Sequence, residues 1–119
     1  MGPLGSLTGA AAPVALDGLE ARQQTRAHNL ANTHTPGFTA QHVDFESGLA
    51  AALADGSAAD GNVEAATRTF PTPTMPDAKG NTVNPATELI GSQKDQLTRD
   101  GLVAVLNNQM TMLRTALQR

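Results

Sequence analysis

Three histidines and two carboxylates are the residues whose types could do chemistry in this chain. His28, His34 and His42 lie six and eight residues apart, and Asp44 and Glu46 follow two apart. Neither histidine spacing is typical of a zinc site, and the chain has no cysteine. Asp44 and Glu46 would share one face of an extended segment, as acid–base pairs can, but no nucleophile or phosphate-binding glycine loop accompanies them. We therefore expect no catalytic residue, metal or cofactor, and interpret the two carboxylates as a solvated edge or a partner contact.

A helix end followed by a tight turn is predicted from Asn29 to Phe38. Asn32 is a residue type that tolerates the left-handed backbone just past a helix end. Thr35-Pro36-Gly37-Phe38 is typical of a turn, because proline sets φ at about −65° and glycine supplies a positive φ at the next position. The turn would place Phe38 beside the helix that has just ended.

The N-terminal helix is assigned to residues 7–32. Its regular part is expected to begin near Pro13, since proline suits a first helical position. Met1–Ser6 is typical of an expression-vector remnant. Spacings of three and four predict a narrow stripe on one face, mainly away from Arg22 and Arg26. The stripe consists of Leu16, Leu19, Gln23, Ala27 and Leu30.

The C-terminal helix is assigned to residues 84–119. Asn84 is a good N-cap, Pro85 suits the first helical position and Glu88 places a negative charge in the first turn. Asp95 and Arg99 are spaced to pair along the helix. Gly91 and Gly101 mark points of bending or close approach. Leucines and methionines form a stripe longer than that of the first helix: Leu102, Leu106, Met110, Leu113 and Leu117.

Between the helices we expect a turn and extended segment over 33–48 and a flexible, variable middle over 49–83. Pro71, Pro73 and Pro76 exclude helix and central strand there. A short helical turn at 50–54 and a weak edge strand at 63–70 are the regular elements expected in this middle. The predicted fold class is mainly α, with terminal helices pairing as a coiled-coil-like domain around a largely irregular Pro/Gly/Ala-rich middle.

Composition limits both the partners and the core. The chain has 119 residues, a net charge of −3 and no basic run, which disfavours nucleic acid. No apolar segment approaches the ~20 residues that span a bilayer, so membrane insertion is not expected. With 39% apolar but 3% aromatic residues, the isolated chain should bury too little area for high stability. We therefore expect neighbouring subunits to cover an assembly seam formed by Leu16, Leu19, Leu30, Leu102, Leu106, Met110, Leu113 and Leu117.

The motif around the turn resembles a known family. Asn29, Leu30, Ala31, Asn32, Thr35, Pro36, Gly37 and Phe38 match the N-terminal signature shared by axial proteins of the bacterial flagellum, the rod, hook and hook-filament junction subunits. Two further matches, Val43–Glu46 and Gly80–Asn84, resemble the small proximal-rod subunit of the FlgB type. That subunit usually has aspartate at the position of Asn84. The resemblance covers about Ala15 to Glu46 and Gly80 to the end.

The resemblance implies a structural subunit of the flagellar basal body, not an enzyme. Its terminal helices would pair and self-assemble beside other rod subunits and the MS ring, in the periplasmic rod. Export through the flagellar type III apparatus would need no cleavable signal peptide. The alternative function is a small helical adaptor or chaperone-like binding module, which would use the same assembly seam to hold one partner helix.

Overall fold

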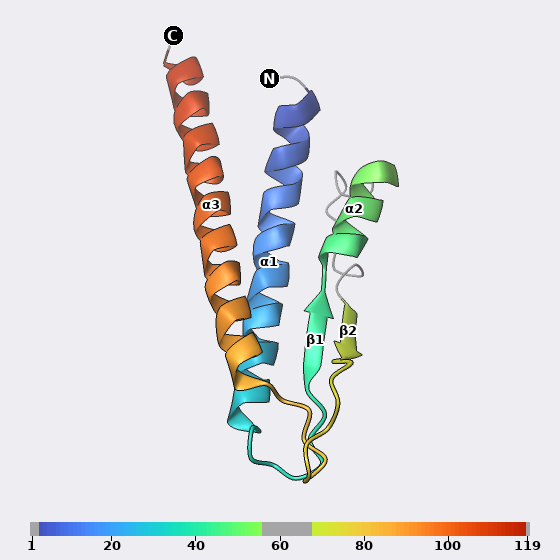
Figure 1. Cartoon of the computed structure of the whole chain (residues 1–119). Helices are drawn as coiled ribbons and strands as arrows, with labels where there is room; N and C mark the ends of the chain where they lie inside the picture. Colours follow the sequence, from blue (N-terminus) through green and yellow to red (C-terminus); the bar gives the residue numbers. More distant parts are fainter. Residues whose placement is uncertain (1–2, 56–67, 119) are drawn as a thin grey trace.

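Two long helices packed side by side form the body of the molecule in the computed structural model, which describes residues 3–55 and 68–118. Helix α1 (Pro3–Ala31) and helix α3 (Pro85–Leu117) run in opposite directions (Figure 1). Strand β1 (Gln41–Asp44) and strand β2 (Arg68–Pro71) pair antiparallel, and helix α2 (Glu46–Asp55) follows β1. This arrangement confirms a mainly α fold whose terminal helices pack together around short strands and an irregular middle.

Helix α1 begins at Pro3, upstream of the predicted start, and Pro13 lies inside it. The prediction that the regular helix begins near Pro13 was wrong. The run Ala10–Ala12 has the highest helix propensity and carries the helix through this region, although an internal proline removes one backbone hydrogen bond. The helix also includes Pro3–Ser6, the part of the chain that we interpreted as a vector remnant.

The end of α1 has the predicted position but a different geometry at Asn32. No described residue other than glycine has a positive φ, so Asn32 is not left-handed. Its backbone N–H instead donates to the Asn29 carbonyl at 3.0 Å, and its side-chain amide donates to the His28 carbonyl at 2.8 Å. The last helical carbonyls are thereby satisfied by a tightened turn and a side chain. The following turn is as predicted: Gly37 has a φ of 73°, and the Phe38 N–H donates to the Thr35 carbonyl at 3.2 Å.

The packed face of α1 is apolar in its middle and polar near its C-terminal end. Its members recur at spacings of three and four: Ala12, Ala15, Leu19, Arg22, Arg26 and Asn29. Phe45 packs on Ala15 and Leu19 to form the core, with Leu102 against it. Gly18 allows this contact, because a Cβ there would overlap the Phe45 ring. The expectation that both arginines lie away from the packed face was wrong, because long guanidinium side chains can pack their stems and bond with their tips.

Helix α3 begins as predicted but is covered along only part of its length. The Asn84 side chain accepts from the Thr87 N–H at 3.3 Å, and Pro85 opens the helix. Two residues of α3, Glu88 and Asp95, are buried. Leu102 and Leu106 are half-buried, whereas the large apolar side chains nearer the C-terminus are exposed.

The middle of the chain contains more regular structure than predicted. Helix α2 begins at Glu46, inside the segment expected to be extended, and continues past the predicted turn at 50–54. Ala52 of α2 is buried against Val14 and Leu49, so packing on α1 stabilises this helix. Strand β2 overlaps the end of the predicted strand at 63–70, the rest of which lies outside the described residues.

Candidate functional site: the motif joint

The two chain segments that carry the family resemblance bond directly to each other. The Gly37 N–H donates to the Lys79 carbonyl at 2.8 Å, and the Thr82 N–H donates to the Phe38 carbonyl at 3.1 Å. The Thr82 hydroxyl accepts from the Ala40 N–H at 2.7 Å. In Figure 1 the two loops meet at the end of the molecule where α1 ends and α3 begins. We call this structure the motif joint and define it as Asn29, Asn32, Thr35, Gly37, Asn81 and Thr82.

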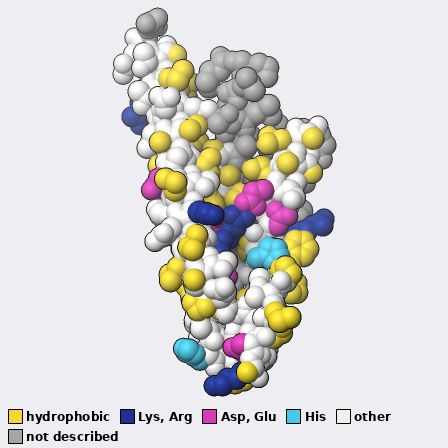
Figure 2. Space-filling model, in the orientation of Figure 1, with side chains coloured by type: hydrophobic (Ala, Val, Ile, Leu, Met, Phe, Trp, Pro, Cys, Tyr) yellow, Lys and Arg dark blue, Asp and Glu magenta, His cyan; other side chains and the backbone are white. Residues whose placement is uncertain are grey.

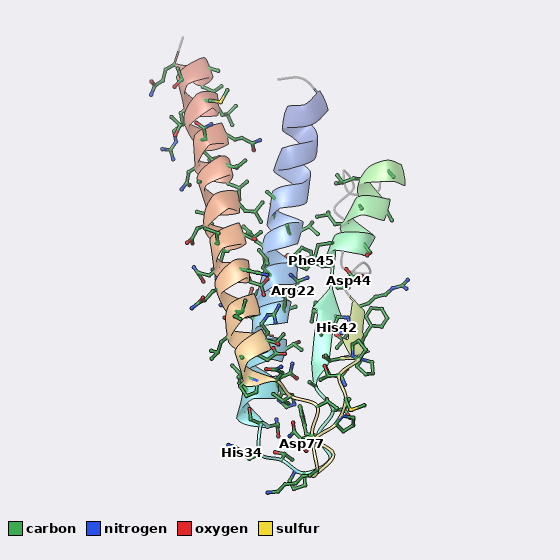
Figure 3. All side chains as sticks on the ribbon, in the orientation of Figure 1. Arg22, His34, His42, Asp44, Phe45 and Asp77 are labelled. Atoms are coloured by element: carbon green, nitrogen blue, oxygen red, sulfur yellow. The ribbon has the colours of Figure 1, made fainter. Side chains whose placement is uncertain are left out.

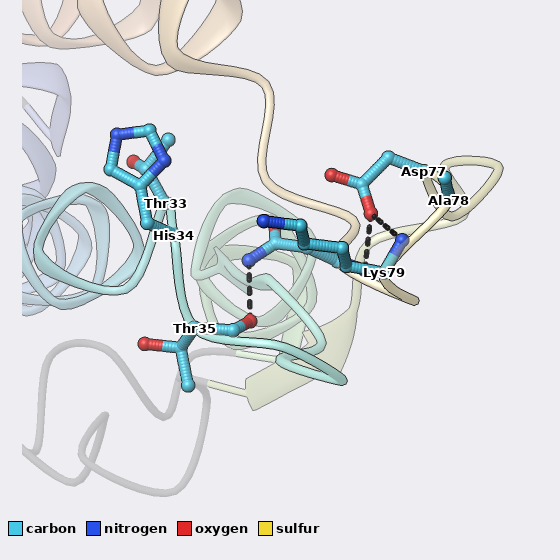
Figure 4. Close-up of a pocket in the computed structure, with 7 residues that line it drawn as sticks. Thr33, His34, Thr35, Asp77, Ala78 and Lys79 are labelled. Carbon is cyan, nitrogen blue, oxygen red and sulfur yellow. Dashed lines mark hydrogen bonds between the residues drawn. The ribbon is translucent and has the colours of Figure 1, made fainter.

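Asn81 holds the N-terminal turn from the other segment. Its buried side-chain amide donates to the carbonyls of Asn32 and Thr35, both at 2.8 Å, and its Oδ1 accepts from the Val83 N–H at 2.7 Å. The bond to Thr35 is drawn in Figure 4. Aspartate has similar size but no donor, so it could not make the first two bonds.

Asn29 bonds to β1 as a neighbouring strand would. It has no exposed surface, its Nδ2 donates to the Gln41 carbonyl at 2.7 Å, and its Oδ1 accepts from the Gln41 N–H at 3.0 Å. Further along β1, Arg22 donates to the Val43 carbonyl through Nε and Nη2, at 3.2 and 3.1 Å. Strand β1 is therefore paired with β2 on one side and with side chains of α1 on the other.

Two glycines and one aspartate set the path of the loops in the motif joint. Gly37 and Gly80 have φ angles of 73° and 78°, and a Cβ on Gly80 would lie 3.4 Å from the Gly37 Cα. Asp77 accepts from the backbone N–H groups of Asn81 and Lys79, at 3.0 and 2.8 Å. These bonds, that of Asn81 first, lower the pKa of Asp77. The loop therefore prefers an ionised Asp77.

Next to the motif joint, an ion network of Arg22, Arg26, Glu46, Glu88 and Asp95 joins α1 to α3 and to the start of α2. Asp95 accepts from Arg22 Nη1 at 3.1 Å and from Arg26 Nε at 2.9 Å. Arg26 also contacts Glu88 at 3.4 Å, and Arg22 contacts Glu46 at 2.5 Å. In Figure 2 basic and acidic side chains gather at the middle of the molecule.

Arg22 is the central member of the ion network. Burial acts to lower the pKa of its guanidinium, but hydrogen bonds with Glu46 and Asp95 outweigh burial and raise the pKa above its ordinary value. Its guanidinium carbon also lies 4.6 Å from the centre of the Phe45 ring (Figure 3). Arg22 therefore connects the apolar core to the carboxylates of α2 and α3.

Two details of α3 follow from this network. Asp95 pairs with the arginines of α1, and the ion pairs between described residues include none with Arg99, so the predicted Asp95–Arg99 pair was wrong. Gly91 is a point of close approach, as predicted, because a Cβ there would overlap the Arg26 guanidinium. Around Gly101, by contrast, no atom beyond the adjoining residues and helix backbone lies within 4 Å of the position that a Cβ would take.

The three histidines lie in separate places. His28 packs edge-on against Phe38 with ring centres 5.6 Å apart, and His42 stacks on Phe70 at 5.5 Å. His34 lines an open hollow of about 250 Å³ beside the motif joint (Figures 3 and 4). In residues 3–55 and 68–118 no group of three or more histidine, cysteine or acidic residues is placed to hold a metal ion.

Asp44 and Glu46 do not share one strand face, because the chain turns into α2 between them. Asp44 Oδ1 accepts from the Ser47 N–H at 3.1 Å, and this bond lowers the pKa of Asp44. Glu46 instead contacts Arg22. One carboxylate therefore caps a helix and the other belongs to the ion network.

Sequence reasoning identified the motif residues but missed what several of them contact. The missed bonds are those of Asn81, Arg22 and Arg26. A signal was present in the spacing, because Arg22, Arg26 and Asn29 continue the three-and-four pattern of Ala15 and Leu19. Counting only apolar residues concealed that pattern.

The site has a structural role in the chain, since the motif residues bond to one another and hold a helical hairpin together. No family model matches the chain. The chain is similar to the flagellar basal body rod protein FlgB of several Cereibacter sphaeroides strains, with 30% identity over 108 residues, or 83% of this chain and 84% of the relative. The chain belongs to the FlgB family of flagellar basal body rod proteins. This membership confirms the resemblance, and the relatives' name is that of a structural protein of the flagellum, not of an enzyme.

Among the described residues, no helix combines the length and apolarity needed to cross a bilayer.

Proposed function

We propose that the chain is a structural subunit of the proximal rod and self-assembles through its terminal helices. The observation that carries this proposal is the exposure of the C-terminal half of the assembly seam. Met110, Leu113 and Leu117 are 51%, 47% and 78% exposed. Full burial of such a side chain is worth roughly 1.5–3 kcal/mol, so covering all three would contribute substantially to assembly.

The assembly seam divides into a part used within the chain and a part left open. Leu19 is buried and Leu102 packs on the same core, while Leu16, Leu30 and Leu106 are half-buried. The open part lies at the end of α3 far from the motif joint (Figure 1). We infer that the motif joint and the ion network hold α3 against α1 at one end, and that a neighbouring subunit covers α3 at the other. A head-to-tail contact of this kind extends into an open stack.

The family membership supports the remaining parts of the proposal. The neighbours would be other rod subunits and the ring proteins at the base of the rod. The subunit would act in the periplasmic rod and would be exported without a cleavable signal peptide.

The test is a charge placed in the open part of the assembly seam. Leu113→Asp should abolish incorporation into rods and motility, because assembly would bury an unpaired carboxylate. Leu106→Asp should do the same, but Leu106 is half-buried in the free chain, so Leu113 separates assembly from folding better. The matched control is Asn107→Asp, at an exposed polar position of α3.

The free Leu113→Asp chain should keep the helix content of the parent by circular dichroism. Normal motility of cells that carry Leu113→Asp would refute assembly through the seam. A saturable one-to-one complex with one partner helix, without concentration-dependent extension, would support the adaptor function instead.

A further inference from the structure

A second apolar face runs along α3, separate from the assembly seam. Its large side chains are spaced seven, eight and seven residues apart, which places them on one side of a helix with 3.6 residues per turn. They are Ile90, Leu97, Val105 and Met112, exposed by 55%, 75%, 43% and 56%. This side lies about a third of a turn from the side that carries Asp95 and Leu102 toward α1. In Figure 2 hydrophobic side chains recur along much of α3.

Gly101 lies at the centre of this second α3 face. Leu97 and Val105 are four residues before and after it, and Ile90 and Met112 are eleven before and after it. Beyond the adjoining residues and helix backbone, nothing lies within 4 Å of the position that a Cβ of residue 101 would take, so no packing within the described chain requires a glycine there. A glycine inside a helix costs about 1 kcal/mol relative to alanine. A glycine at the middle of an apolar face also allows another backbone to approach closely.

Large apolar side chains of the second α3 face thus lie at equal distances before and after Gly101. Such symmetry is the condition for a self-complementary contact. We propose that the second α3 face binds the same face of a second copy of this chain, with the two α3 helices antiparallel and crossing at Gly101. Leu97 of one copy then opposes Val105 of the other, and Ile90 opposes Met112. The contact is isologous and closes a pair of free subunits, so it is distinct from the head-to-tail contact that we propose for the assembled rod.

Charge favours the antiparallel direction over the parallel one. Lys94 lies on the second α3 face, seven residues before Gly101, and Asn108 lies seven residues after it. Antiparallel pairing places Lys94 opposite Asn108, whereas parallel pairing would place two lysines opposite each other. The charged residues between Leu97 and Met112 are Arg99 and Asp100, which the helical period turns to other sides.

Cysteine cross-linking tests the contact directly, since this chain has no cysteine. In the full chain, Gly101→Cys should form a disulfide-linked dimer under mild oxidation, because the two positions meet at the crossing. The matched control is Asn107→Cys, at an exposed position of α3 on a side that carries neither the assembly seam nor the second α3 face, and it should remain monomeric. A dimer yield from Gly101→Cys no greater than that from Asn107→Cys would overturn the proposal.

The direction of pairing is tested by mixing two variants of different mass, one carrying a tag. Leu97→Cys mixed with Val105→Cys should cross-link about tenfold faster than either variant alone, because only the mixture brings two thiols together in an antiparallel pair. Faster cross-linking of Leu97→Cys with itself would overturn the antiparallel arrangement.

The same mixture in a Leu113→Asp background separates this proposal from the proposed function. Cross-linking should persist there, because Leu113 belongs to the assembly seam and not to the second α3 face. Its loss would show that the pairing depends on the seam and would overturn the separate face.

Discussion

Replacing Asp95 by asparagine should destabilise the chain more than any other substitution that removes one charge from α3. Asp95 is 7% exposed and accepts hydrogen bonds from Arg22 and Arg26, whose side chains are 14% and 22% exposed. Asparagine has the same shape but carries no charge, and its amide group would face a guanidinium donor. The change therefore leaves two partly buried cations without their shared counterion.

The expected size follows from what each arginine retains. Removing one partner of a buried ion pair costs about 3–5 kcal/mol. Arg22 keeps Glu46 and the Val43 carbonyl, and Arg26 keeps a longer contact with Glu88 at 3.4 Å. The loss should therefore fall at or below the lower end of that range, at about 2–3 kcal/mol. With an m-value of about 1–3 kcal/mol per M in urea, the unfolding midpoint should drop by about 0.7–3 M.

Urea unfolding followed by circular dichroism measures this shift. The matched control is Asp100→Asn on the same helix, where an exposed carboxylate accepts from Gln96 at 3.1 Å. Its effect should stay within about 0.5 kcal/mol. If Asp95→Asn lowers the midpoint no further than Asp100→Asn does, the ion network does not hold α1 to α3 and the reasoning fails.

Two further changes test the motif joint and the core. Because hydrogen bonds lower the pKa of Asp77 in the folded chain, its contribution to stability is complete above the ordinary aspartate pKa of about 3.9 and is lost as the pH falls through the lowered value. When the pH is lowered from neutral to acid, the thermal midpoint of Asp77→Asn should accordingly fall less than that of the parent chain. An equal fall in both chains would show that the ionised Asp77 does not stabilise the loop. Gly18→Ala should cost about 1–3 kcal/mol in urea unfolding, because its methyl group overlaps the Phe45 ring, and Phe45→Leu should reduce that cost. If Gly18→Ala costs as much stability in the Phe45→Leu chain as in the parent chain, its effect does not come from overlap with the Phe45 ring.

Local chemistry was enough to predict some parts of the fold. The start of α3 follows from Asn84 and Pro85, and the turn follows from Pro36 and Gly37, because each of these residues restricts the backbone at its own position. Pro13 misled the prediction of where α1 begins, since proline is compatible with the first turn of a helix but does not require it.

Contacts between distant segments could not be predicted in the same way. Arg22 and Asn29 are polar, so a pattern based on apolar spacing places them toward solvent. Their burial depends on β1, which supplies carbonyl and N–H groups at the right distance. Asp95 likewise has a plausible partner one turn away in Arg99, and only the packing of α3 on α1 selects the arginines of the other helix.

The pairing of β1 on both sides also limits how this chain can aggregate. An open strand edge is a template for adding strands from other molecules, which is a route to aggregation. On β1 the edge next to α1 is already occupied by Asn29 and Arg22. The other strand, β2, is short and ends in Pro71, which has no N–H to donate. Growth by strand addition through β1 and β2 is therefore disfavoured, which leaves helix packing as the route for the assembly that we propose.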